Sequence, residues 1–464
     1  MKLTTAQSDR AAGVMLGTAC GDALGAGYEF GPAFDGDVEM KGGGGFAWAP
    51  GEWTDDTSMA VPILRAAATG RDLRDETVLD EIVTAWVDWA KTAPDVGIQT
   101  RRVLSGIAPT ASAVRESAKH VHDQSGRSGG NGSLMRTAPV ALAYLDDPNG
   151  LAEAARAISD LTHYEEDAGD ACVLWCLAIR HAVLTGELDV RIGLPTLAPD
   201  RAALWAERIT VAEAQQPKAF TKNGWVVEAL QGAWSSIVHG ISLVDSLERA
   251  VRGGNDTDTV AAISGGLLGA RWGMSAIPAA WQRIVHGWPE LTSLDLVRLS
   301  GEVVRGEPAA TRVPYAHSGD ISTLVQHPHD NGVWLGAVGA LDKLPAEVDA
   351  VVSLCRVGTQ QVPDRIRERL EIRLIDEPGP EENPNLNFVL ADAADAIAAL
   401  RAEGRTVFLH CVQAISRTPT VAALYSARHL GVRMDSALED VCAALPYAQP
   451  NEGFRAALQA LDGQ

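Results

Sequence analysis

The hydrophobic pattern changes its period once along the chain, near residue 305. Before that point apolar residues recur at helical spacing, and Gly, Pro and Asp separate the helical stretches. These stretches are 11–27, 57–69, 76–91, 151–185, 200–215, 224–239 and 259–272. Beyond it, apolar runs at 332–337, 349–355, 370–375 and 406–410 alternate with helical patterns at 361–369, 386–403 and 419–431. The change predicts an all-α domain of roughly ten or more helices, followed by an α/β domain with a largely parallel sheet.

The length supports this division into two domains. A chain of 464 residues exceeds the size at which one hydrophobic core usually stops growing. Hydrophobic residues make up 46% and charged residues 21%, so each part can bury a core of its own. We place the all-α domain at 1–305, a linker at 306–320 and the α/β domain at 321–464.

The charge and the apolar pattern restrict the partners. A net charge of −21 argues against general affinity for nucleic acid or for anionic membranes. The chain does not start with a basic segment followed by a long apolar one, and no window holds about 18 uninterrupted apolar residues. We therefore expect a soluble, cytoplasmic protein. The six cysteines do not form a disulfide framework, and Cys172 and Cys176 are expected to be buried as small apolar residues.

Two segments in the first part, 51–57 and 253–259, each deliver two carboxylates and flanking threonines to the start of a helix. The acids are Asp55, Asp56, Asp256 and Asp258. One interpretation is a plain helix start, with Thr54 as the N-cap and the acids in the first turn. However, carboxylates at a buried helix end repel each other unless a cation neutralises them. Two such segments can share a cation site, and ligands that are all oxygen favour magnesium, manganese or calcium over zinc.

Three further segments are candidates for the same site. Glycines at 17, 21 and 25 form a bare stripe on one helix face, which indicates close helix packing, but Asp22 and Glu29 could reach the metals. A glycine-rich turn over 129–133 precedes a helix, and its N–H groups can cradle an anion. His163 precedes another helix, although a lone histidine is more often structural.

All five segments, in this order, resemble the ADP-ribosylglycohydrolase family of the dinitrogenase reductase-activating type. The GDALG, WTDDT, NGSLMR, TH and D-x-D-T pieces match over about residues 8–290. The resemblance implies an all-α fold around two metal ions, usually Mg²⁺ or Mn²⁺. The implied metal ligands are Thr54, Asp55, Asp56, Asp256, Asp258 and Thr259. The implied substrate contacts are Gly130, Asn131, Gly132 and Ser133 on a diphosphate-binding loop, and His163; Glu29 is an acid that approaches the metals.

The implied reaction breaks the bond at the anomeric carbon of a ribose through an oxocarbenium-like transition state. A metal pair can orient a water and lower its pKa. One of Asp55, Asp56 and Glu29 would accept the proton of that water, and the sequence does not distinguish them. The substrate would be an ADP-ribosylated protein or an ADP-ribosyl small molecule, whose acceptor stays open between arginine, serine, a base and a metabolite.

The second part contains a loop of the form Cys-x₅-Arg, from Cys411 to Arg417, between an apolar run and a helix that starts near Pro419. The loop N–H groups and the helix N-terminus would surround an anion and favour a nucleophilic Cys411 thiolate. Arg417 can bind phosphate bidentately, and Ser416 can hydrogen-bond the thiolate. The alternative is a buried cysteine at an ordinary strand–helix turn.

This loop resembles the dual-specificity branch of the protein tyrosine phosphatase superfamily, over roughly 320–464. The resemblance implies an α/β fold, a phosphorylated ligand and a separate aspartate as general acid. Asp376 is the best match for that acid, and Asp364 is a weaker one. The family usually has Ala-Gly in mid-loop, where this chain has Gln413-Ala414, which adds a Cβ beside the phosphate and leaves the substrate open.

We therefore expect a two-domain hydrolase that cleaves an ADP-ribosyl glycosidic bond and removes phosphate from a second ligand. One alternative is a sensor that binds ADP-ribose and phospho-ligands without turnover and has an inactive phosphatase domain. Another is a different metal-dependent hydrolase on the first fold.

Overall fold

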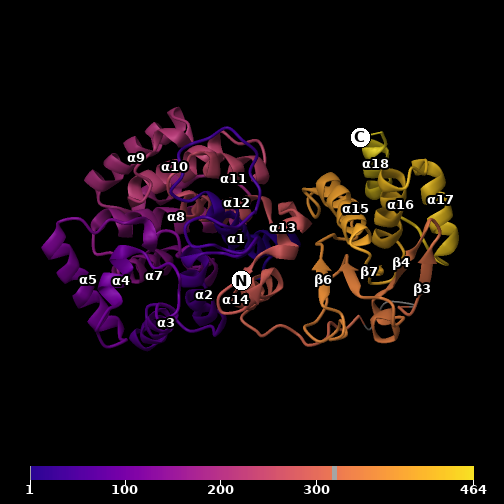
Figure 1. Cartoon of the computed structure of the whole chain (residues 1–464), viewed down its shortest axis with the longest axis horizontal. Helices are drawn as coiled ribbons and strands as arrows, with labels where there is room; N and C mark the ends of the chain where they lie inside the picture. Colours follow the sequence, from indigo (N-terminus) through magenta and orange to yellow (C-terminus); the bar gives the residue numbers. More distant parts are fainter. Residues whose placement is uncertain (1, 316–320, 464) are drawn as a thin grey trace. The chain divides into compact units, whose positions relative to one another are not determined.

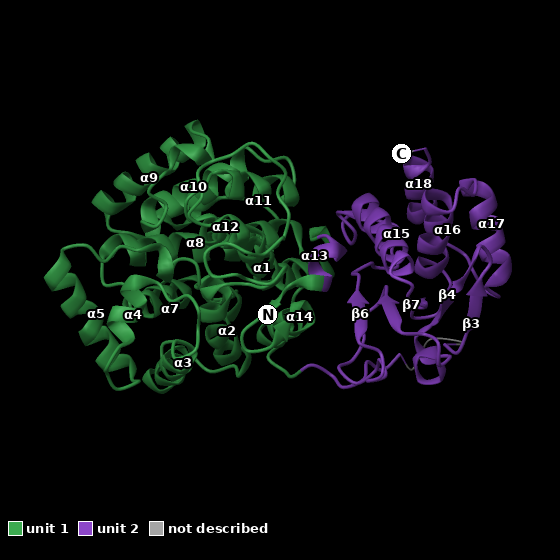
Figure 2. Cartoon of the chain, in the orientation of Figure 1, with its two compact units in different colours: residues 1–277, 284–308 green, residues 278–283, 309–464 purple. Residues whose placement is uncertain are grey.

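The computed structural model describes residues 2–315 and 321–463. It divides into two compact units (Figure 2): unit 1 comprises residues 1–277 and 284–308, and unit 2 comprises residues 278–283 and 309–464. Within the stretch expected to be a linker, 306–320, residues 316–320 lie outside the described residues. Residues 309–315 belong to unit 2, where Gln360 N–H donates to the Thr311 carbonyl at 2.9 Å and the Tyr315 hydroxyl donates to the Arg356 carbonyl at 2.6 Å.

Unit 1 is helical (Figure 1). Its helices are α1 (Thr5–Gly25), α2 (Asp55–Ala68), α3 (Glu76–Trp89), α4 (Ile98–Leu104), α5 (Ala111–Ser125), α6 (Ala138–Ala143), α7 (Pro148–Asp160), α8 (Glu166–Thr185), α9 (Pro199–Ala214), α10 (Val226–Val238), α11 (Leu243–Arg252), α12 (Thr257–Trp272) and α14 (Ser293–Arg305). A short hairpin joins β1 (His286–Gly287) to β2 (Leu291–Thr292). The helical stretch predicted at 151–185 is interrupted, since α7 and α8 are separate and His163 lies between them.

Helices α1 and α12 form the centre of unit 1 and lie antiparallel with their backbones in contact. A Cβ on Gly17 would lie 2.2 Å from the Gly265 carbonyl oxygen, and one on Gly269 would lie 1.9 Å from the Gly13 carbonyl oxygen. Only glycine permits so close an approach, which confirms the packing role predicted for the α1 stripe. The same register brings the end of α1 to the start of α12, because a Cβ on Gly25 would lie 2.4 Å from the Asp258 Cα.

Helix α8 is long and apolar enough to cross a membrane by length and composition alone. However, 78% of its most apolar window is buried inside the unit, as in the core helix of a soluble protein. Cys172 and Cys176 on this helix are fully buried, as predicted.

Unit 2 is a five-stranded sheet in the order β3-β4-β7-β5-β6. The strands are β3 (Leu324–His327), β4 (Asp330–Ala337), β5 (Ala350–Ser353), β6 (Glu368–Glu371) and β7 (Val407–Cys411). The pairing of β3 with β4 is antiparallel, and the other three pairings are parallel, so the sheet is largely parallel as predicted. Strand β3 was not predicted, because four residues beside the expected linker carry little periodic signal.

The helices of unit 2 that follow β6 are α15 (Leu386–Ala402), α16 (Arg417–His429), α17 (Met434–Ala444) and α18 (Glu452–Leu461); α13 (Ala279–Ile284) precedes the sheet and contributes most of its residues to this unit. All four later helices share one apolar core with alternate strand residues such as Val407 and Leu409. Phe408 points to the opposite face and packs in a second core. Cys411 is the last residue of the central strand β7, and α16 begins at Arg417, after the intervening loop.

The helix predicted at 361–369 is wrong, and so are both ends of the strand predicted at 370–375, because β6 comprises Glu368–Glu371 and residues 372–375 are not in a strand. Residues 361–367 are turns and irregular chain, and β6 begins at Glu368. Pro363 lacks the N–H that a helix interior needs. Arg365 instead donates to the Pro345 carbonyl at 2.9 Å, and Arg369 donates to the Ile366 carbonyl at 2.8 Å. These contacts between side chain and backbone hold the segment out of a helix.

Candidate functional site

Asp22 on α1 fixes the start of α2 and thereby the first acidic cluster, which we define as Asp55 and Asp56. Its carboxylate accepts from the Thr54 N–H at 2.8 Å and from the Thr57 N–H and hydroxyl at 2.9 and 2.7 Å. Burial raises the pKa of Asp22 to about 6. Thr54 is the N-cap residue but makes no side-chain cap bond; its hydroxyl instead donates to Asp56 at 3.1 Å.

The second acidic cluster, which we define as Asp256 and Asp258, meets the first one at the helix ends. Single carboxylate oxygens of Asp22, Asp56 and Asp258 lie within 4.8 Å of one another. Oxygens of Glu29, Asp256 and Asp258 form a second such group, which shares Asp258 with the first. Acids far apart in the sequence therefore converge at one place, at the ends of α1, α2 and α12.

This concentration of carboxylates is electrostatically unfavourable by itself. Burial, and then the neighbouring carboxylates, raise the pKa values of Asp55, Asp56 and Asp258 well above the ordinary range. The same two causes raise the pKa of Glu29 to about 9. Asp56 Oδ1, Asp258 Oδ1 and Glu29 Oε2 are buried and have no hydrogen-bond partner in the described chain. Unsatisfied oxygen ligands without nitrogen or sulfur are the donor set of a hard divalent cation, so the residues present fit one.

Asn131 joins the glycine loop, which we define as Gly129–Ser133, to the second acidic cluster. Its side-chain amide donates to Asp256 Oδ2 at 2.8 Å and to the Asn223 carbonyl at 2.9 Å. Asn223 in turn accepts from the Asp256 N–H at 3.1 Å. Burial raises the pKa of Asp256, and the hydrogen bonds from Asn131 and Thr259 oppose that rise.

The His163 ring lies against the glycine loop. A Cβ on Gly130 would lie 3.2 Å from His163 Nε2, and one on Gly132 would lie 3.1 Å from His163 Cε1. The Arg136 guanidinium donates to the Thr162 hydroxyl at 2.6 Å, and that hydroxyl lies 2.8 Å from His163 Nδ1. Burial, assisted by Arg136, lowers the pKa of His163 well below its usual value. A neutral ring that accepts at Nδ1 carries its N–H on Nε2, directed at the glycine loop.

Ser133, the last residue of the glycine loop, points inward. Its side chain is fully buried and accepts a weak bond from the Cys172 thiol at 3.6 Å. Ser133 therefore contacts α8 through Cys172, while Gly130 and Gly132 face His163.

A pocket of about 570 Å³ adjoins the first acidic cluster, and we call it the tryptophan pocket. Its wall includes the aromatic residues Trp48, Trp53, Trp89 and Trp288 and the acids Glu52, Asp55, Asp95 and Glu290. No lysine or arginine is among the described residues that line it. Asp95 was not predicted as a site residue. Its pKa is raised by burial and then by Asp256, which places it in the field of the second acidic cluster.

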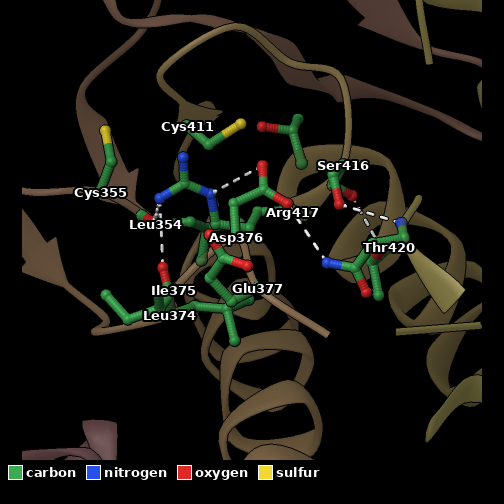
Figure 3. A network of polar contacts seen from close by, with 12 residues as sticks. Leu354, Cys355, Leu374, Ile375, Asp376, Glu377, Cys411, Ser416, Arg417 and Thr420 are labelled. Atoms are coloured by element: carbon green, nitrogen blue, oxygen red, sulfur yellow. Dashed lines mark hydrogen bonds and ion pairs between the residues drawn. The ribbon is translucent and has the colours of Figure 1, made fainter. Parts of the chain in front are cut away.

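In unit 2, Arg417 is anchored beneath the cysteine loop, which we define as Cys411–Arg417. Its Nη1 donates to the Leu354 and Leu374 carbonyls at 3.0 and 3.1 Å. Its Nε lies 3.5 Å from Asp376 Oδ2. Figure 3 shows the guanidinium below the Cys411 side chain, with the Asp376 carboxylate beside it. Asp364, the weaker candidate for the acid, is fully exposed, and its Oδ1 lies 3.7 Å from Arg369 Nη2 instead.

The middle of the cysteine loop has an unusual backbone. Ala414 adopts a φ of 58°, in the left-handed region that favours glycine, and its side chain is buried. This is the position where glycine is usual in the dual-specificity phosphatases that the loop resembles. The loop thus keeps the shape that a glycine would give it, and alanine strains it.

A family model described as ADP-ribosylglycohydrolase matches residues 3–312, about two thirds of the chain. The chain belongs to the ADP-ribosylglycohydrolase family. It is 31% identical over 277 residues to the ADP-ribosylarginine hydrolase Tri1 of Pseudomonas putida (strain GB-1), covering 57% of this chain and 71% of that protein. It is 30% identical over 284 residues to the ADP-ribosyl-dinitrogen reductase glycohydrolase of Rhodospirillum rubrum, covering 57% and 86%.

The C-terminal part of this glycohydrolase-family chain has relatives of its own, which are dual-specificity phosphatases. It is 33% identical over 126 residues to the dual specificity phosphatase 28 of Mus musculus, covering 26% of this chain and 73% of that protein. Both resemblances noted in the sequence are therefore confirmed, and the molecule joins a glycohydrolase unit to a phosphatase-like unit.

Three polar residues of these two sites carry no signal in a single sequence. Asp95 lies in the loop after α3, Asn223 in the turn before α10, and Asn451 immediately before α18, where it donates to Asp376. None belongs to a periodic pattern or to a glycine-rich turn, so only the fold brings them to the sites.

Proposed function

We propose that unit 1 hydrolyses the bond between ADP-ribose and the guanidinium of an arginine, with divalent metal ions in its acidic centre. The observation that carries this proposal is the tryptophan pocket beside Asp55. Indole faces attract cations, carboxylates pair with them, and a planar guanidinium can use both at once. A similar protein, from Pseudomonas putida, is named an ADP-ribosylarginine hydrolase, which supports the same acceptor.

The metal ions, Mg²⁺ or Mn²⁺, would be held by the two acidic clusters together with Thr54 and Thr259. The three buried carboxylate oxygens that lack hydrogen-bond partners support this assignment. When bound, such ions polarise ribose hydroxyls and lower the pKa of a water molecule. Glu29 completes the group of acids. Burial raises its pKa most, and a metal would relieve the repulsion from neighbouring carboxylates that raises it further.

The chain supplies the remaining chemistry. The glycine loop and the Nε2–H of His163 would bind the diphosphate of the substrate. Asp55 lines the pocket as well as the acidic centre, and it would accept the proton of the attacking water. The bond from the anomeric carbon to the guanidine nitrogen breaks, and Asp95, whose pKa is raised, would protonate the departing nitrogen.

The proposal is tested by offering the full chain ADP-ribosylarginine and ADP-ribosylserine with Mg²⁺, Mn²⁺ or a chelator. We expect release of ADP-ribose from the arginine conjugate at least about tenfold faster, and only with metal. Asp55→Ala combined with Asp256→Ala should abolish release, whereas Asp200→Asn, at an exposed position on α9, should not change it. Equal cleavage of both conjugates would contradict the arginine acceptor, and full activity in the double variant would contradict the metal centre.

For unit 2 we propose a phosphomonoesterase in which Cys411 is the nucleophile, Arg417 binds the phosphate and Asp376 is the general acid. The placement of the Arg417 guanidinium below Cys411 and beside Asp376 supports these roles (Figure 3). The full chain should hydrolyse p-nitrophenyl phosphate, and Cys411→Ser should remove that activity. An inactive wild type would instead assign the unit to phosphate binding or regulation.

A further inference from the structure

The first turn of α18 touches both loops that the phosphatase chemistry needs. One contact leads to the cysteine loop, and the other leads to the chain around Asp376. Both start from the short segment 449–453, which lies between α17 and the body of α18. This segment belongs to neither of the motifs recognised in the sequence.

Two main-chain bonds attach the segment to the cysteine loop. The Gln449 N–H donates to the Ile415 carbonyl at 2.6 Å. The Asn451 N–H donates to the Ser416 hydroxyl at 3.2 Å. A hydroxyl that accepts this bond keeps its own proton available for donation.

Two further contacts attach the segment to the acid. The Asn451 side-chain amide donates to Asp376 Oδ1 at 3.3 Å. A Cβ on Gly453 would lie 2.4 Å from the Pro378 carbonyl oxygen and 2.9 Å from its Cα, so the helix backbone rests directly on the chain that carries Asp376. The side-chain oxygen of Asn451 meanwhile accepts from the Phe454 N–H at 2.9 Å as the N-cap of α18.

We propose that Asn451 is a positioning residue that holds the Asp376 acid in place over the cysteine loop, with Gly453 setting the distance. The proposal rests on the phosphatase function proposed for unit 2. Asn451 ties the acid to the same helix turn that holds Ser416, and that helix is fixed by Phe454, which is fully buried in the core. The acid and the cysteine loop therefore share one rigid support.

The reaction shows where such positioning matters. The Cys411 thiolate forms a bond to phosphorus while the bond from phosphorus to the leaving oxygen breaks, and Asp376 gives that oxygen its proton. Water then displaces the thiolate, and the Asp376 carboxylate takes a proton from the water. A good leaving group departs without the proton, whereas a poor one depends on it. Loss of positioning should therefore slow poor leaving groups selectively.

The experiment uses the full chain with Asn451→Ser, because serine also caps a helix but lacks the amide that reaches Asp376. Phenyl phosphate is the substrate with the poor leaving group, and p-nitrophenyl phosphate is the one with the good leaving group. We expect kcat for phenyl phosphate to fall at least about tenfold more than kcat for p-nitrophenyl phosphate. Gly453→Ala should produce the same selectivity, and it provides a second reading if the serine variant folds poorly.

Asn331→Ser is the matched control, because Asn331 is exposed near the start of β4, at the end of the sheet opposite Cys411. It should leave both rates unchanged. A wild type that is active, with Asn451→Ser slowing both substrates equally or neither, would overturn the role of Asn451 and leave the phosphatase intact. A wild type inactive on both substrates would overturn the phosphatase function itself, and the positioning role with it.

Discussion

The side-chain amide of Asn131 donates to the Asp256 carboxylate at 2.8 Å, which connects the glycine loop to the second acidic cluster. The two residues lie 125 positions apart in the sequence. Asn131 is itself fixed, because the same amide donates to the Asn223 carbonyl at 2.9 Å. The loop proposed to bind diphosphate and the centre proposed to bind metal are thus one hydrogen-bonded assembly.

Asn131→Ala should therefore weaken both functions of the assembly. A hydrogen bond to a charged group contributes about 1.5–3 kcal/mol, so kcat/KM for ADP-ribosylarginine should fall roughly 10- to 100-fold. The apparent affinity for Mn²⁺ should fall as well, since Asp256 loses the donor that orients it. Steady-state kinetics and a Mn²⁺ titration of the same preparation measure the two effects. A change in KM alone, with unchanged Mn²⁺ affinity, would show that Asn131 serves only the substrate.

Asp258→Asn should have opposite effects with and without metal. Burial, and next the charges of Asp56 and Glu29, raise the pKa of Asp258, so its charged form destabilises the metal-free fold as the pH rises above the ordinary carboxyl range. Without a cation, the variant should be more stable than the wild type at neutral pH, because its side chain cannot take the charged form that burial and the neighbouring carboxylates disfavour. With Mn²⁺ the order should reverse.

The measurement is thermal unfolding of the full chain in a chelator and in Mn²⁺, at pH 5 and pH 7.5. The advantage of the metal-free variant should shrink at the lower pH, where the wild-type carboxyl is closer to its neutral form. A variant that is less stable than the wild type under every condition would argue that Asp258 has a structural role and not a metal-binding one.

The parts of unit 1 that could be predicted are those that local sequence determines. The starts of α2 and α12 follow from acids and threonines placed just before apolar helical patterns, and the α1 stripe predicts close packing. Convergence of the two acidic clusters could be inferred only because both have the same form. The role of Asp22 was half predicted, because its place beside the cluster was expected but its bonds to Thr54 and Thr57 were not.

The rest depends on contacts between distant segments. Asp95 enters the site on a loop, and the tryptophans of the pocket come from three separate segments of the sequence. In unit 2, no helix forms at 361–369, because Pro363 lacks the N–H of a helix interior and Arg365 donates to distant carbonyls instead. Asn451 reaches Asp376 across 75 positions, and no local pattern indicates such a contact.

The stability of unit 2 should depend on the titration of His410. Burial, and then the Arg417 charge, lower the pKa of this histidine from 6.5 to about 4. The unfolded chain therefore binds the additional proton first, and stability is lost as the pH falls from 6.5 towards 4, by about 3 kcal/mol in all. Hydrogen exchange of the β7 amides between pH 4.5 and 7 measures this dependence. His410→Gln should flatten it, and an identical slope in the variant would assign the dependence to another group.

The strained alanine in the cysteine loop gives the last prediction. Ala414 has a φ of 58°, and a left-handed conformation costs a residue with a side chain about 1–2 kcal/mol. Ala414→Gly should therefore raise the free energy of unfolding of unit 2 by about 1 kcal/mol, despite the entropy that glycine adds to the unfolded chain. The matched control is Ala427→Gly within α16, which should lower that free energy by about the same amount. Denaturant unfolding of both variants measures the pair. If both glycines destabilise unit 2, the loop is not strained at Ala414, and the alanine there is accommodated as well as a glycine would be.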